Sequence, residues 1–117
     1  MYTEKDNKTV NILGTDYEIK FVPEEELDEI GADAATDWSA KLIRIKVFVP
    51  SKYDMKDLEM FQRKLIRHEI IHAFLYESGL AECSGNTGAW AKCEAAVDFF
   101  AYQHNKIHAA FERAGAL

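Results

Sequence analysis

Residues 67–79, RHEIIHAFLYESG, carry two histidines four positions apart, with a glutamate directly after the first. At about 100° per helical residue, His68 and His72 lie about 40° apart around the axis and Glu69 about 60° beyond His72, so the three side chains leave one side of a helix. Two imidazoles placed in this way can bind one Zn²⁺, and the neighbouring carboxylate can take a proton from a water molecule. The HExxH pattern therefore predicts a zinc site with His68 and His72 as ligands and Glu69 as general base.

A catalytic zinc site needs a third protein ligand, and the segment CEAAVDFF, residues 93–100, offers one. Glu94 and Asp98 lie four apart among apolar residues, where an unpaired carboxylate is costly to bury. Glu94 lies 22 residues after His72, and Asp98 lies four residues after Glu94. This pattern resembles the gluzincin metallopeptidases, which have HExxH and then ExxxD on a following helix. The resemblance implies that His68, His72 and Glu94 bind zinc, that Glu69 is the general base, and that Asp98 accepts a hydrogen bond from a ligand histidine.

Among gluzincins, the chain is most similar to the small ImmA/IrrE-like and minimal-gluzincin proteins of phages and mobile elements. The similarity lies in its short length, in a hairpin before the first long helix and in the segment EAAVDFFA. The chain departs from the ImmA/IrrE pattern in the spacing between the ligand glutamate and a downstream Phe-Ala pair. The resemblance implies a zincin-like hydrolase that cleaves peptide bonds in a protein or peptide substrate without a covalent intermediate. A group that stabilises the oxyanion should exist, and Tyr53, Tyr76 and Tyr102 are candidates by their chemistry.

Three alternatives stay open. In zincins such as the SprT-like group the third ligand is a histidine, a role that His104 or His108 would have to fill in place of Glu94. A second possibility is a non-catalytic domain in which zinc ties two helices together for partner binding. The third is a helical interaction module without metal, in which the motif is accidental. His104 and His108 themselves are expected to be ordinary polar residues near a helix end.

The composition limits the classes of partner and location. Fourteen Lys and Arg against 20 Asp and Glu leave a formal charge of −6, which repels phosphate backbones and anionic lipids, so we expect no nucleic-acid or membrane partner. The N-terminal segment MYTEKDNKTV lacks the features of a signal peptide, which favours a cytoplasmic location. Cys83 and Cys93 do not make a disulfide framework and are expected as small buried thiols. The oligomeric state stays open.

The 117 residues are expected to form a single domain, 1–117, in which a small sheet positions the site. Alternation around Gly14 predicts a hairpin with strands at about 9–13 and 16–22, and KLIRIKVFV, residues 41–49, is the clearest strand. We expect 41–49 to be the edge strand to which an extended substrate could pair.

Helices account for the remainder of the predicted fold. A short helix follows Pro23 and stops at Gly31, a long one occupies about 54–76, and another begins near Asn86 or Thr87 and runs to Gly115. The expected fold is thus α+β, a zincin-like antiparallel sheet of about three strands packed on two long helices.

Overall fold

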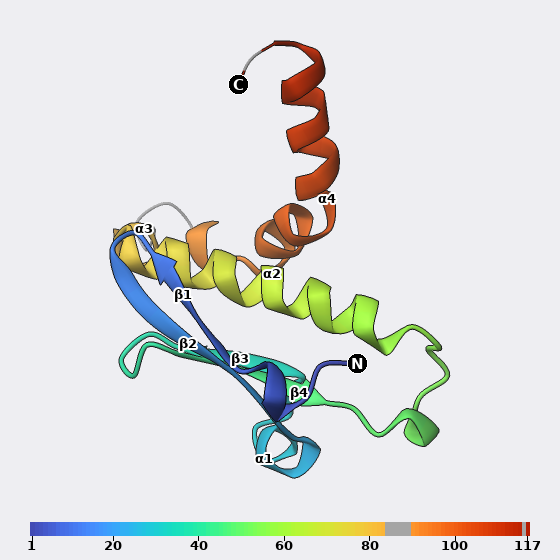
Figure 1. Ribbon diagram of the computed structural model, residues 1–117. Helices are drawn as coiled ribbons and strands as arrows, with labels where there is room; N and C mark the ends of the chain where they lie inside the picture. The colour runs from blue at the N-terminus through green and yellow to red at the C-terminus, as the bar shows by residue number, and fades with distance from the viewer. Residues whose placement is uncertain (84–89, 116) are drawn as a thin grey trace.

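The computed structural model describes residues 1–83, 90–115 and 117. Its centre is a four-stranded sheet with the strand order β1-β2-β4-β3. The long helix α2 runs across one face of this sheet, the short helix α1 lies on the other side, and α4 crosses α2 (Figure 1). The later turns of α4 extend away from the rest of the molecule (Figure 1).

The sheet begins with the predicted hairpin. Strand β1, Lys8–Ile12, pairs antiparallel with β2, Thr15–Pro23, through a tight turn. Gly14 has a φ of 91° in this turn, a conformation that favours glycine over other residues. The alternating residues Tyr17, Ile19 and Phe21 of β2 are buried in the core, which confirms the predicted hairpin and its inward face.

Two further strands complete the sheet. After α1, Glu24–Asp28, the chain forms β3, Ala34–Asp37, and turns back into β4, Leu42–Val47. Strand β4 pairs antiparallel with β3 and parallel with β2, so the sheet is mixed. Ile43 and Ile45 of β4 are fully buried in the core, whereas Lys46 forms ion pairs with Asp28 and Asp33.

The predicted sheet was therefore only partly correct. The fold is α+β, but the sheet has a fourth strand and is not purely antiparallel. The expectation that 41–49 forms the edge is wrong, because β4 lies between β2 and β3, and the edge strands are β1 and β3. Strand β3 was missed because its sequence AATD shows no alternation of large apolar and polar side chains.

Helix α2 spans Leu58–Glu77 and carries the HExxH motif. Its N-cap is Asp57, whose side chain accepts a hydrogen bond from the main-chain N–H of Met60. No glycine or proline interrupts it, and the chain leaves the helix at Gly79, which has a φ of 83°. Leu58, Leu65 and Ala73 of α2 pack in the core beneath the helix, and α2 also contacts α4.

Among the described residues, α3 and α4 are the α-helices that follow α2. The short α3, Leu80–Cys83, is followed after the undescribed residues by a 3₁₀ turn at Trp90–Lys92 and by α4, Glu94–Arg113. The predicted start at Asn86 or Thr87 lies outside the described residues, and the long helix itself begins later, at Glu94. Within the described part of the chain, no helix is long and apolar enough to cross a membrane.

Candidate metal centre

His68 and His72 of α2 face Glu94 of α4, and Glu69 lies beside them against Thr36 of β3. His68 and Glu69 are buried, with 8% and 6% of their surface exposed, and His72 is partly buried. The Nε2 atoms of His68 and His72 lie 3.1 Å apart, so the two imidazoles point at a common position. The helical spacing of four residues is sufficient to produce this arrangement.

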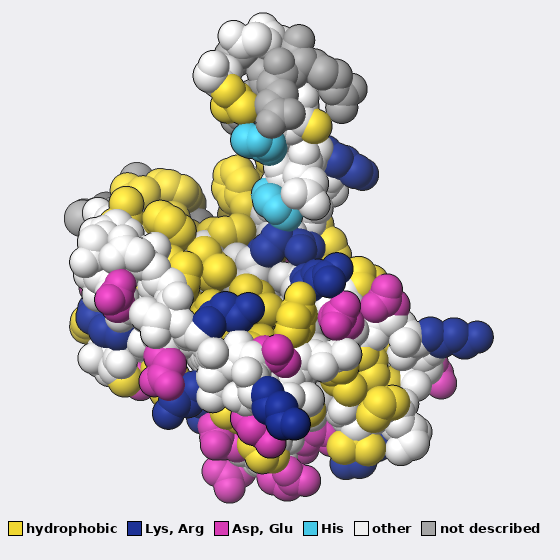
Figure 2. Space-filling model, viewed as in Figure 1, with side chains coloured by type: hydrophobic (Ala, Val, Ile, Leu, Met, Phe, Trp, Pro, Cys, Tyr) yellow, Lys and Arg dark blue, Asp and Glu magenta, His cyan; other side chains and the backbone are white. Residues whose placement is uncertain are grey.

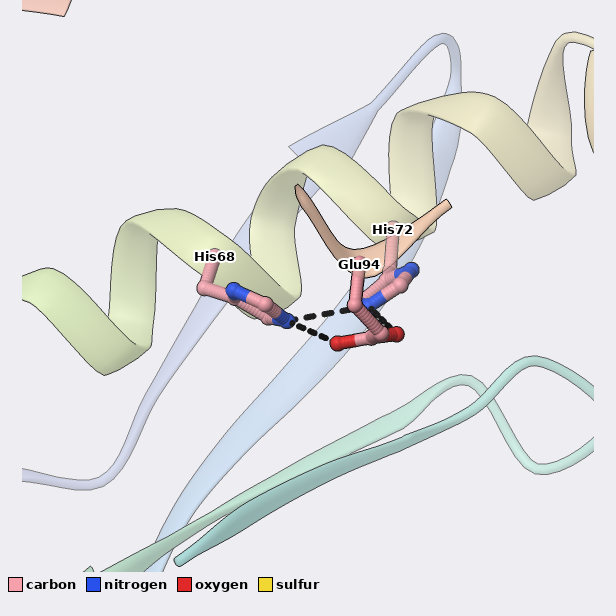
Figure 3. Close-up of side chains that lie close together, drawn as sticks. All are labelled: His68, His72 and Glu94. Atoms are coloured by element: carbon pink, nitrogen blue, oxygen red, sulfur yellow. Dashed lines mark hydrogen bonds and ion pairs between the residues drawn. The ribbon is translucent and has the colours of Figure 1, made fainter. Parts of the chain in front are cut away.

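Glu94, the first residue of α4, approaches both histidines. Its Oε2 lies 2.9 Å from Nε2 of His68, and its Oε1 lies 3.0 Å from Nε2 of His72. Figure 3 shows the three side chains pointing toward one another, with Glu94 reaching across from α4. The structure thus brings Glu94 to two histidines that lie 22 or more positions before it in the chain and on a different helix.

The three side chains lie close enough together to hold a metal ion. Two nitrogens and one carboxylate oxygen are a donor set found in catalytic zinc sites, where donors about 2.0–2.2 Å from the metal lie about 3.3–3.6 Å from one another. The closest separations between the donor atoms of His68, His72 and Glu94, 2.9 to 3.1 Å, are a few tenths of an ångström shorter than that spacing, and one ligand atom from each lies within 4.8 Å of the others. Among the described residues this is the one group of three or more such side chains with this geometry.

Asp98 occupies the position that orients a ligand histidine. Its Oδ1 lies 2.6 Å from Nδ1 of His68, on the opposite side of the ring from the Nε2 that faces Glu94. The same oxygen lies 2.8 Å from Nζ of Lys64, a buried lysine one turn before His68 on α2. An N–H of His68 bonded to Asp98 leaves Nε2 as the atom free to bind a metal. Lys64 was not identified as a site residue from the sequence. Its position four residues before His68, on the same side of the helix, is the signal that could have identified it.

The electrostatics of the centre follow from burial and from these partners. Partial burial raises the pKa of Asp98, but hydrogen bonds with Lys64 and His68 outweigh burial and hold it below its usual value. Burial lowers the pKa of His72 despite the nearby Glu94 carboxylate, which favours the neutral ring that binds metals. Burial also raises the pKa of Glu69, partly opposed by a hydrogen bond from Thr36, so this carboxylate is a stronger base than an exposed one.

Thr36 on strand β3 is a site residue that the sequence did not suggest. Its Oγ1 lies 2.9 Å from Oε1 of Glu69 and 3.2 Å from the main-chain oxygen of the same residue. The contact joins the edge of the sheet to α2 across 33 positions of sequence. Spacing within the chain gives no signal for it, because the partner is on another element.

Two adjoining hollows lie over the cluster and share Glu69, His72 and Glu94. One has a volume of about 230 Å³ and extends toward Asp33, Ala34 and Lys64. The other has a volume of about 200 Å³ and extends toward Thr36 and Tyr76. Together they form a cleft along β3 that passes over the candidate ligands.

Of the three tyrosines considered for the oxyanion, only Tyr76 lines this cleft. Tyr53 donates a hydrogen bond to Glu24, which lies in α1 on the other side of the sheet. The ring of Tyr102 lies 4.8 Å from Nζ of Lys64. Tyr76 stacks on Trp38, with 6.1 Å between the ring centroids, and remains the candidate for this role.

The other histidines and the cysteines lie elsewhere. His104 and His108 are exposed and line a separate hollow, and Figure 2 shows histidine side chains on the extended part of α4, away from the body. Of the residues that the structure describes, Glu94 is the one that reaches His68 and His72 on α2, and His104 and His108 do not. The thiol of Cys93 is free and exposed, so the expectation that it is buried is wrong, and the side chain of Cys83 lies outside the described residues.

Comparisons of the chain with models of protein families, with curated proteins and with solved structures gave no match. The gluzincin resemblance therefore depends on the HExxH and ExxxD residues and on the arrangement of their side chains.

Proposed function

We propose that the protein is a zinc-dependent metallopeptidase of the gluzincin type. The observation that supports this most strongly is the convergence of His68, His72 and Glu94 from two helices, with Glu69 buried beside them. Asp98 adds a second feature that a metal-bound histidine normally has, a carboxylate on its other ring nitrogen. Accidental HExxH sequences in ordinary helices have no reason to assemble these additional groups.

In this proposal each residue has a distinct role. His68, His72 and Glu94 would hold the ion, and a bound zinc would supply Lewis-acid chemistry to the substrate carbonyl and to a water. Glu69 accepts the proton of the attacking water and later passes it to the leaving amine. Asp98 fixes the orientation and the protonated nitrogen of His68.

The substrate would be a protein or peptide in extended conformation. Ala34 and Thr36 of the edge strand β3 line the cleft, and an exposed edge can pair with a peptide main chain above the candidate ligands. The edge proposed for pairing is thus β3 rather than the segment 41–49. The net charge of −6 favours such a substrate over nucleic acid, and we propose a cytoplasmic location for the reaction.

A non-catalytic zinc-stabilised binding domain is the second candidate. The observation that favours it is the position of Glu94 at the start of α4, where a metal would tie this helix to α2. In that case zinc would contribute to folding, and Glu69 would have no chemical role.

The first experiment measures the zinc content of untagged protein purified without added metal. We expect one zinc per chain in the wild type, loss in Glu94→Ala and His72→Ala, and retention in His104→Ala, a matched control on the extended part of α4. Glu69→Gln should then keep zinc and lose peptidase activity on a fluorescent casein substrate. A metal-free, well-folded wild type would refute the metal centre, whereas equal activity of wild type and Glu69→Gln would refute the enzyme.

A further inference from the structure

The hydroxyl of Thr36 makes a directed contact with the side chain that the mechanism uses as base. Oγ1 lies 2.9 Å from Oε1 of Glu69 and 3.2 Å from its main-chain oxygen. A hydroxyl has one proton to donate, and a carboxylate is the stronger acceptor, so the shorter of the two contacts is the main hydrogen bond. Thr36 therefore donates to one defined oxygen of Glu69.

The two carboxylate oxygens of Glu69 consequently have different surroundings. Oε1 is bound by Thr36, whereas Oε2 faces the ligand cluster at 3.7 Å from Nε2 of His68. The last torsion of a glutamate side chain is broad, so an unrestrained carboxylate can rotate and exchange its oxygens. A hydrogen bond to Oε1 limits that rotation and keeps Oε2 directed at the ligand cluster.

Strand β3 holds Thr36 firmly enough for this purpose. Thr36 pairs with Ile43 of β4, a fully buried core residue. The turn that follows is closed by Asp37, whose Oδ1 accepts main-chain hydrogen bonds from Ser39 and Ala40. A valine has nearly the shape of threonine, so it would fill the same space without a hydroxyl to donate.

We propose that Thr36 is a positioning residue that orients the Glu69 carboxylate toward the metal centre. The inference rests on the proposed metal centre but does not require that the protein be an active peptidase. The hydrogen bond from Thr36 joins the edge strand β3, along which a substrate would lie, to the proposed base Glu69 on α2. The substitution that tests it is Thr36→Val, which removes the hydroxyl and keeps the branched shape.

The test compares cobalt-loaded proteins by visible absorption, since the spectrum of bound Co²⁺ responds to its ligands and to the hydrogen bonds around them. We expect Thr36→Val to bind Co²⁺ in the same amount as the wild type and to change the spectrum in the direction seen for Glu69→Gln. Thr36→Ser, which restores a hydroxyl, should return the wild-type spectrum. Thr9→Val, the same substitution at an exposed position of the other edge strand, is the matched control.

Activity provides a second readout. On fluorescent casein we expect the kcat of the zinc form of Thr36→Val to fall roughly 10- to 100-fold with little change in KM, as for other groups that orient the residues of a metal site. Thr36→Ser should recover most of the loss. Thermal unfolding of the same proteins checks that they are folded, and Thr36→Ala replaces the valine variant in the spectra if that variant does not fold.

The outcomes separate this inference from the proposed function. A Thr36→Val protein with the wild-type spectrum and the wild-type kcat would overturn the role of Thr36 and leave the peptidase intact. A wild type that binds Co²⁺ but does not cleave casein would count against the peptidase, while the spectra of the valine and serine variants would still decide the role of Thr36. A wild type that binds no Co²⁺ would overturn both.

Discussion

Replacement of Asp98 by asparagine tests whether the contact between α4 and His68 serves a metal. The side chain has nearly the same shape, so the perturbation is the loss of one negative charge. Oδ1 of Asp98 is shared by Nδ1 of His68 at 2.6 Å and by Nζ of Lys64 at 2.8 Å. Asparagine would leave the buried lysine without its counter-ion and give the imidazole a weaker acceptor.

The expected magnitude follows from those two contacts. Loss of a carboxylate that orients a metal-bound histidine costs roughly 10- to 100-fold in metal affinity, which corresponds to about 1.4–2.8 kcal/mol. The ion pair itself contributes less, about 1 kcal/mol or below to folding, because 42% of the Asp98 side chain is exposed to solvent. Asp98→Asn should therefore weaken zinc binding more than it weakens the metal-free fold.

The assay is competition for Zn²⁺ against a chromophoric chelator, combined with urea unfolding of the metal-free protein. Asp54→Asn, the same change at an exposed loop position before α2, is the matched control. Lys64→Met alone should produce part of the loss, and the double variant should lose less than the sum, because both residues act through one oxygen. Zinc affinity of Asp98→Asn within twofold of the wild type would refute the reasoning.

Three further predictions concern stability. Hydrogen bonds from the main-chain N–H of Val49 and from Lys52 lower the pKa of Glu24 from 4.5 to about 2, so the stability due to its charge is complete above about pH 4.5 and is lost as the pH falls toward 2. Glu24→Gln should therefore lower the urea midpoint at pH 6 and flatten its decline between pH 4.5 and pH 3, and an unchanged decline would contradict this. Gln62 is fully buried and bonds to both main-chain groups of Tyr2 and to the carbonyl of Lys46, so Gln62→Ala should cost about 2–3 kcal/mol in urea unfolding at pH 7. Zinc at about 100 times its Kd should raise the unfolding free energy of the wild type by about 2.7 kcal/mol. Calorimetry should show no such rise for His72→Ala, and equal stabilisation of both proteins would place the ion elsewhere.

The helix around the HExxH motif, and the placement of its side chains on one side, could be predicted from the sequence alone. An α-helix is built from contacts between residues three or four positions apart, so the pattern HExxH predicts that His68, Glu69 and His72 share one side of α2. The hairpin around Gly14 was equally local, because a tight turn and alternating side chains specify it. Glu94 and Asp98 could be named because their spacing matched a known pattern, although only the packing of α4 on α2 brings them to the histidines.

Other features depended on contacts that no local pattern records. Strand β3 consists of small and polar residues. Because β3 pairs with β4, the segment 41–49, which is the clearest strand in the sequence, lies in the interior of the sheet and not at its edge. The start of α4 at Glu94 likewise differs from the sequence expectation. The bond from Thr36 to Glu69 follows from the pairing of β3, since it requires an edge strand beside α2 and a threonine at the position that faces Glu69. The sequence therefore determined which residues could do chemistry within one helix, and the tertiary structure decided which strand and which residues surround them, because pairing between distant segments depends on the whole chain.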